Sequence, residues 1–326
     1  MTRVLVTGAA GFVGGALAAR LARDPLALDA PPGALLLADA HRPAPALEPT
    51  PALDGARWLT GDLADPAYVD ALAAEAPDVV FHLASVPGGA AERDPALGSA
   101  VNLHGTLRLL EQLARRAAPG RPPVVVFTST VAVYGAPLPA QGVDAATPAR
   151  PLTSYGAHKL MTEVLLADLS RRGALDGRSL RLPGIVARPP QAGGHVSAFM
   201  SDLIHRLAAG QAYTCPVSAD ATCWWMSVGC CVDNLLRAAR WPAAGLDAGR
   251  VWQMPVLHAS VGELVAALAR RFGDERRALV TWAPQDAVEQ QFGRQPPLAT
   301  PAARALGLAD DGTLDRLIER ALHPGA

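Results

Sequence analysis

The amino-acid sequence predicts an α/β protein with a Rossmann-type, doubly wound parallel sheet and a smaller, interleaved C-terminal substrate domain. Short apolar strands alternate with helix-forming segments, and a glycine-rich turn follows the first strand. Such alternation requires parallel strands joined by right-handed crossovers. A chain of 326 residues can hold one large domain or two closely associated ones. We expect the Rossmann domain at 1–175 plus about 229–252, and the substrate domain at about 176–228 and 253–326.

Composition and charge exclude several classes of protein. The net charge is −1 and charged residues make up 18%, so the chain lacks the basic surface expected of a nucleic-acid-binding protein. Apolar runs are too short to span a membrane, and a strand that begins at Arg3 leaves no room for a signal peptide. We expect a cytoplasmic protein with reduced thiols and no metal site, because no CxxC pair occurs among Cys215, Cys223, Cys230 and Cys231.

The first predicted unit is a strand, a glycine turn and a helix. The strand covers 4–6, and the helix-forming run covers 16–22. Between them, Gly8 allows a tight turn, Gly11 lets the backbone approach a pyrophosphate, and Gly14 lets the helix pack closely. A glycine motif in this position, after a strand and before a helix, indicates dinucleotide binding.

The second predicted strand, 34–38, ends at Asp39. A carboxylate there can accept hydrogen bonds from the adenosine-ribose hydroxyls and would repel a 2′-phosphate, which favours NAD over NADP. His41 and Arg42 lie close by and keep NADP open as the less favoured cofactor. Alternatively, Asp39 only ends the strand.

The remaining elements follow the same alternation. A proline-rich surface loop is expected at 40–57, and Asp62, after the next strand, is placed to meet the adenine amino group. Ligands bind at the carboxyl ends of such parallel strands. Further strands are expected at 78–83, 124–127 and 179–185, and helices at 97–118, 197–209, 232–240 (packed on the first domain) and 262–272.

Tyr155 and Lys159 form the central catalytic candidate. They stand four residues apart, so on a helix their side chains share one face. A free tyrosine has a pKa of about 10, and a nearby ammonium and an oxidised nicotinamide both favour the phenolate. The pair can therefore act as a general base that takes a proton from an alcohol. Alone, this spacing is more typical of a solvated Tyr and Lys on an amphipathic helix, and the assignment depends on the other motifs.

The motifs TGAAGFVG, GDL, HLAS, VNLHGT, FTSTVAVYG and SYGAHK, in this order, resemble the extended short-chain dehydrogenase/reductase family, which includes NAD-dependent sugar-nucleotide epimerases and dehydratases. The resemblance covers nearly the whole chain. It implies that Tyr155 is the catalytic acid/base and that Lys159 binds the nicotinamide ribose and lowers the tyrosine pKa. It implies that Thr130 is the hydroxyl partner, with Ser129 as the second choice.

The resemblance also implies a cofactor site and an assembly. Asn102 matches a family asparagine near the cofactor, although it could instead bond the backbone within its helix. A homodimer through the helices at about 97–118 and 151–172 is implied. The implied cofactor residues are Gly8, Gly11, Phe12, Val13, Asp39, Asp62, Leu63, Leu83, Ala84, Asn102, Tyr155, Lys159 and Pro183.

Within the family, the segments 82–92, 151–156, 166–173 and 181–183 are similar to the D-erythronate dehydrogenase branch. That resemblance implies NAD-dependent oxidation of the 2-hydroxyl of a small sugar acid. The chain departs from the branch after Arg188-Pro189, where GKPN is replaced by PQAG, and near Trp224, where the branch arginine is absent. An acid substrate would then need another cation, such as Arg188. The expected substrate residues are Ser85, Thr130, Tyr155, Arg188, His195 and Trp224, although His195 could be an exposed loop residue and Trp224 or Trp225 plain core.

Two other functions stay open. An NAD-dependent nucleotide-sugar epimerase or dehydratase is the first alternative, but such relatives use an Arg-Asp pair where this chain has Cys223-Trp224. A non-catalytic NAD(P)-sensing regulator is the second. A regulator would often lack the tyrosine or the lysine, and both are present in this chain.

Overall fold

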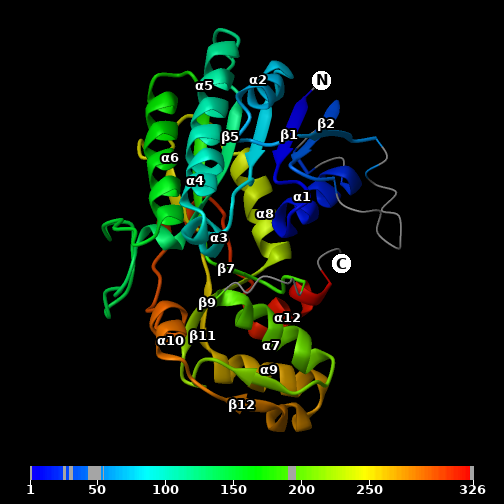
Figure 1. The fold of residues 1–326 in the computed structure, drawn as a ribbon, viewed down its shortest axis with the longest axis vertical. Coiled ribbons are helices and arrows are strands. Elements are labelled where there is room, and N and C mark those ends of the chain that lie inside the picture. Colours follow the sequence, from blue (N-terminus) through cyan, green and yellow to red (C-terminus); the bar gives the residue numbers. More distant parts are fainter. Residues whose placement is uncertain are drawn as a thin grey trace. The chain divides into compact units, whose positions relative to one another are not determined.

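The computed structural model describes residues 2–24, 27–28, 32–42, 53, 55–189 and 196–323. The chain divides into two compact units. Unit 1 holds residues up to Val133 together with Ala149–Arg181 and Val232–Gln253, and unit 2 holds the rest. Each unit has its own sheet and helices, as Figure 1 shows.

Unit 1 is built on a seven-stranded sheet in the order β10-β6-β5-β4-β1-β2-β3. The strand pairs β1–β2, β1–β4, β2–β3, β4–β5 and β6–β10 are all parallel. The predicted fold class is therefore confirmed. The strands are β1 (Arg3–Thr7), β2 (Ala34–Asp39), β3 (Arg57–Thr60), β4 (Val79–His82), β5 (Val124–Thr130), β6 (Asp176–Leu182) and β10 (Val251–Gln253).

Helices cover both faces of this sheet. Alternate strand residues such as Leu5 and Val125 pack on α2 (Pro66–Ala74), α5 (Thr106–Arg116) and α6 (Ser154–Arg171) in one apolar cluster. Figure 1 shows α5 and α6 side by side on this face. On the other face, an ion pair of 3.2 Å joins α1 and α8; its partners are Arg20 of α1 (Phe12–Arg23) and Asp233 of α8 (Val228–Ala239).

In place of the single long helix predicted at 97–118, the structure has several consecutive helical segments. The chain forms α3 (Gly88–Arg93) and α4 (Pro95–Gly98), then one π-helical segment, Ser99–Gly105, before α5. At Gly105 an added Cβ would lie 2.3 Å from the carbonyl oxygen of Leu63. The helix therefore packs there directly on a loop backbone, a tertiary contact that helix propensity does not encode.

Unit 2 contains two small sheets around its own apolar core. One has the order β11-β9-β7 and the other pairs β12 with β8. The strands are β7 (Gly184–Val186), β8 (Tyr213–Cys215), β9 (Thr222–Ser227), β11 (Leu257–Ser260) and β12 (Val280–Trp282). The helices are α7 (Phe199–Ala208), the start of α8, α9 (Val261–Phe272), α10 (Asp286–Phe292), α11 (Pro301–Ala305) and α12 (Leu314–Leu322).

Several sequence-based boundaries differ from the structure, two of them at the division between the units. The strand expected at 179–185 is two strands, β6 and β7, in different units. They are separated by Pro183, which has no N–H to continue a ladder. Residues 134–148 belong to unit 2, where Val143 bridges Leu298. The loop expected at 40–57 lies mostly outside the described residues.

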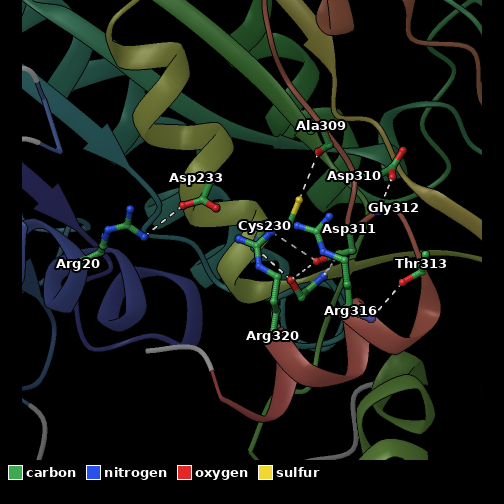
Figure 2. A network of polar contacts seen from close by, with 11 residues as sticks. Arg20, Cys230, Asp233, Ala309, Asp310, Asp311, Gly312, Thr313, Arg316 and Arg320 are labelled. Atoms are coloured by element: carbon green, nitrogen blue, oxygen red, sulfur yellow. Dashed lines mark hydrogen bonds and ion pairs between the residues drawn. The ribbon is translucent and has the colours of Figure 1, made fainter. Parts of the chain in front are cut away.

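A buried carboxylate holds the start of α8 (Figure 2). Asp311 is fully buried and accepts hydrogen bonds from the backbone N–H of Ser227, at 2.8 Å, and from its hydroxyl, at 2.5 Å. The Ser227 hydroxyl oxygen in turn accepts the backbone N–H of Cys230 at 3.0 Å. Burial raises the pKa of Asp311 above its usual range. This network caps the helix within unit 2.

The structure also bears on the cysteines and on the expectation that no segment spans a membrane. Cys215, Cys223, Cys230 and Cys231 are all buried free thiols, as expected for reduced cysteines. Across the described part of the chain, none of the helices combines the length and apolar character that a membrane crossing requires.

Candidate active site

The site is built where β5 ends and α6 begins. Thr153 caps α6 by accepting the backbone N–H of Gly156 at 3.1 Å, so the helix starts at Ser154, directly before Tyr155. A Cβ at Gly156 would lie 2.6 Å from the carbonyl oxygen of Ala132. Only glycine allows α6 to approach the turn after β5 this closely. The first turn of α6 is thereby held next to the end of β5.

Lys159 is the buried cation of this site. Its Nζ donates a 2.7 Å hydrogen bond to the carbonyl oxygen of Thr128, and it lies 4.7 Å from the ring centroid of Phe127 and 5.6 Å from that of Tyr155. Burial lowers the pKa of Lys159 to about 7, while the charge of Glu163 acts in the opposite direction. Near neutral pH the Lys159 side chain is therefore divided between ammonium and amine.

The three hydroxyls at the end of β5 have different surroundings. Thr128 is buried and donates to the carbonyl oxygen of His82 at 3.1 Å. Ser129 is buried as well, and its hydroxyl donates a short hydrogen bond to Glu163. Thr130 is partly exposed, and its Oγ1 accepts the backbone N–H of Ala132 at 3.1 Å. These contacts favour Thr130 over Ser129 as the hydroxyl that meets a substrate.

Glu163 and Arg181 are site residues that sequence reasoning missed. Glu163 is 2% exposed, and its two carboxylate oxygens accept Nε of Arg181 at 2.9 Å and an NH2 donor of Arg181 at 2.7 Å. The sequence does carry a signal for Glu163, because it stands four residues after Lys159 and so on the same helix face. For Arg181 the only signal is a charged residue within the strand expected at 179–185.

His82 lies at the end of β4 but is not an acid or base at neutral pH. Its ring nitrogens contact the hydroxyls of Thr7 at 2.7 Å and Thr106 at 2.9 Å. Burial, and secondarily the charge of Lys159, lowers the pKa of His82 to about 3. The neutral ring ties three elements of unit 1 together.

The glycine turn after β1 forms a cradle that fits a dinucleotide. Gly8 has φ +72°, and a Cβ on it would lie 2.7 Å from the backbone nitrogen of Ala84. A Cβ on Gly14 would lie 2.0 Å from the carbonyl oxygen of Gly8, so α1 packs directly on the turn. Gly11 is the exposed N-cap of α1 and supplies no side-chain hydrogen bond. Backbone N–H groups at such a helix start can donate hydrogen bonds to a phosphate.

Asp39 lies at the rim of this cradle. Its Oδ2 accepts the backbone N–H of Ala10 at 2.9 Å, which ties the end of β2 to the glycine turn. Asp62 is exposed, and its Oδ1 accepts the backbone N–H of Ala64 at 2.8 Å. The other predicted cofactor residues of unit 1 divide by exposure: Leu63 is buried, whereas Phe12, Val13, Leu83 and Ala84 are partly exposed.

Asn102 bonds to the loop after β4. Its amide oxygen accepts the backbone N–H of Val86 at 2.7 Å, and its amide nitrogen donates to the Val86 carbonyl at 2.9 Å. The backbone partner is thus outside the helix of Asn102. The same loop holds the partly exposed Ser85 and leads to Gly88, where a Cβ would lie 3.7 Å from Tyr155. Asn102 therefore shapes the wall beside Tyr155.

The remaining predicted residues belong to unit 2. Pro183 is buried, and Arg188 is partly exposed with its backbone N–H bonded to Ser201 at 3.0 Å. Trp224 is 1% exposed, and its indole N–H donates to the carbonyl of Pro296 at 2.6 Å. This burial favours the alternative that Trp224 is core rather than pocket wall. His195 lies outside the described residues.

Comparisons with known proteins agree with these features. Residues 4–253 match the sequence model of the NAD dependent epimerase/dehydratase family. The D-erythronate dehydrogenase of Cupriavidus necator is 38% identical over 322 residues, which cover 97% of this chain and 96% of that protein. The D-erythronate dehydrogenase of Haemophilus influenzae is 31% identical over 274 residues, 83% of each chain.

A solved structure is similar over the full fold. The nucleoside-diphosphate-sugar epimerase from Agrobacterium tumefaciens aligns with a TM-score of 0.90 at 32% identity, and the alignment covers 99% of this chain and 94% of that chain.

Proposed function

The chain belongs to the NAD-dependent epimerase/dehydratase family, and from that premise we propose that it is an NAD-dependent dehydrogenase of a small sugar acid. The reaction interconverts a secondary alcohol and a ketone at the 2-hydroxyl of a D-erythronate-like substrate. Both relatives named D-erythronate dehydrogenase support this substrate class.

One observation carries the chemical part of the proposal. Lys159 Nζ reaches the Thr128 carbonyl at 2.7 Å, which fixes the first turns of α6 against the end of β5. Tyr155 lies one helical turn before Lys159, and Thr130 lies two residues after Thr128. A phenol, an ammonium and a partly exposed hydroxyl are thus gathered at one strand end, where parallel α/β sheets bind their ligands.

Each residue has a role in the proposed reaction. NAD, when bound, supplies the ring that accepts the hydride leaving the alcohol carbon. Thr130 already accepts a backbone N–H and has its own hydroxyl proton to donate to the substrate oxygen. Tyr155, as phenolate, takes the proton of the alcohol at its phenolic oxygen. The ammonium of Lys159 favours that phenolate and binds the nicotinamide ribose.

The cofactor proposal rests on Asp39 and the glycine turn. The Asp39 carboxylate already bonds Ala10 within the turn, so its charge is fixed next to the dinucleotide cradle. A carboxylate in that place disfavours a 2′-phosphate, and we propose NAD rather than NADP.

We also propose a homodimer and a cytoplasmic location. Four of the five large hydrophobic side chains that stand exposed in the described ranges lie on or next to α4 and α6: Leu97, Leu152, Met161 and Val164. Several large apolar side chains exposed on neighbouring elements are typical of an interface between subunits. The buried free cysteines support a reducing compartment.

The test of the function is NADH formation with NAD and a substrate panel. The panel holds four- to six-carbon sugar acids, neutral secondary alcohols, aryl alcohols, and UDP- and GDP-sugars. We expect NADH with a sugar acid. Turnover of neutral or aryl alcohols alone would reject the acid substrate but keep the dehydrogenase.

A nucleotide-sugar epimerase is the second candidate, which the Agrobacterium tumefaciens relative supports by name. An epimerase would convert a UDP- or GDP-sugar to its epimer without net NADH release. Conversion of that kind, with no NADH from any sugar acid, would replace the dehydrogenase proposal.

A further inference from the structure

A buried carboxylate lies one helical turn beyond the catalytic pair. Tyr155, Lys159 and Glu163 follow each other at intervals of four residues, so all three share one face of α6. Glu163 and Lys159 are each 2% exposed. Burying a carboxylate costs free energy of folding unless hydrogen bonds or an opposite charge compensate it.

The contacts of Glu163 connect three elements of unit 1. Glu163, on α6, accepts a hydrogen bond from the Ser129 hydroxyl at the end of β5. It also forms a bidentate ion pair with Arg181 at the end of β6. Ser129 lies directly between Thr128, whose carbonyl accepts Lys159, and Thr130. Glu163 therefore contacts the end of β5 through Ser129 and acts electrostatically on Lys159.

The groups around Lys159 determine which charges act on its ammonium. Besides Tyr155 and Glu163 on its own helix, Lys159 meets the ring of Phe127 and the Thr128 carbonyl from β5, and the neutral His82 from β4. Glu163 is the carboxylate that acts on it, and Arg181 offsets part of that charge.

We propose that Glu163 is a positioning residue of the catalytic pair, which favours the ammonium form of Lys159 and holds the end of β5 through Ser129. This role rests on the proposed dehydrogenase function, since it matters through Tyr155. Without the carboxylate, the amine form of Lys159 would predominate at neutral pH, and the phenolate of Tyr155 would lose the stabilising charge of Lys159.

The chain permits a direct test, because Lys159 is its only lysine. In protein labelled with carbon-13 at the lysine ε position, a single side-chain NMR signal reports the titration of Lys159 without nucleotide or substrate. We expect the wild-type midpoint at about 7. We expect Glu163→Gln to lower it by about one pH unit, a tenfold change in the ammonium-to-amine ratio. Glu163→Asp, which keeps the charge, should stay near wild type.

A matched control separates this effect from the general cost of a broken buried ion pair. Asp176 pairs with the buried Arg178 at the opposite end of β6, at 2.8 Å. Asp176→Asn should destabilise the fold and leave the Lys159 midpoint unchanged. Equal midpoints in Glu163→Gln and Asp176→Asn would overturn the proposal.

A second variant keeps the proposal testable if Glu163→Gln does not fold. Arg181→Gln removes the cation that offsets Glu163, so the Lys159 midpoint should rise; an unchanged or lower midpoint contradicts the proposal. If the enzyme oxidises a sugar acid, the basic limb of its kcat profile should move with the NMR midpoint. Because the titration needs no substrate, failure of the proposed function leaves this result interpretable.

Discussion

Replacing Lys159 by Met should stabilise the fold at neutral and acidic pH while it abolishes catalysis. The lysine is buried, and its pKa in the folded protein is about 7, against 10.5 when exposed. Between these two values the unfolded chain binds a proton that the folded chain does not, so wild-type stability rises with pH across that window. Below about pH 7 the full cost of burying the charge is present. Methionine has a similar shape and no charge to desolvate.

The pKa difference sets the size of the effect. A depression of about 3.5 pH units, at about 1.4 kcal/mol for each, corresponds to about 5 kcal/mol of charge-burial cost at low pH. Methionine leaves the Thr128 carbonyl without its 2.7 Å donor, which costs about 1–3 kcal/mol. At pH 6 the variant should therefore be more stable by about 2–4 kcal/mol.

The assay is urea unfolding of both proteins at equal concentration at pH 6 and at pH 9, followed by tryptophan fluorescence. From the two pKa values, the advantage of the variant should shrink by about 3 kcal/mol across this range. Groups that titrate equally in both proteins cancel in the difference. A stability difference that is the same at both pH values would refute the burial of a charged lysine at this site.

Three further substitutions test other parts of the account. Asp39→Ser should lower kcat/KM with NAD and reduce the NAD-to-NADP ratio of kcat/KM by about tenfold. An unchanged ratio would show that Asp39 does not select the cofactor. Val164→Glu, at a side chain 65% exposed, should convert a dimer to monomers in light scattering, whereas Trp282→Glu in unit 2 should not; a dimer that survives both changes would contradict the α6 interface. Gly156→Ala should destabilise the protein by about 1–3 kcal/mol, since its Cβ would lie 2.6 Å from a backbone oxygen, while Gly15→Ala, with its first contact at 3.6 Å, serves as the tolerated control in thermal melts.

The central sheet was predictable because its inner strands, such as β1, β4 and β5, are largely buried. Segment 124–127 is continuously apolar, which is typical of parallel strands covered by helices on both faces. The shared face of Tyr155 and Lys159 was predictable from helix geometry alone. The sequence pattern of one helix or strand is enough to predict features that depend on that element alone.

What the sequence did not reveal depends on contacts between elements. The π-helical segment before α5 ends at Gly105, which packs on the Leu63 carbonyl. Pro183 divides one expected strand into β6 and β7 where the chain passes from unit 1 to unit 2. Burial of Trp224 depends on a carbonyl 72 residues away, at Pro296. The partners of Glu163 lie on two other strands.

The most direct test of the proposed chemistry is turnover of the Tyr155→Phe variant. The change removes one hydroxyl and leaves Lys159 with its bond to the Thr128 carbonyl and its place over Phe127. With the best substrate of the panel, kcat should fall by about a hundredfold to ten-thousandfold, the usual contribution of a general base, while NAD binding by calorimetry stays close to wild type. NADH formation at the wild-type rate by Tyr155→Phe would contradict the assignment of Tyr155 as the base.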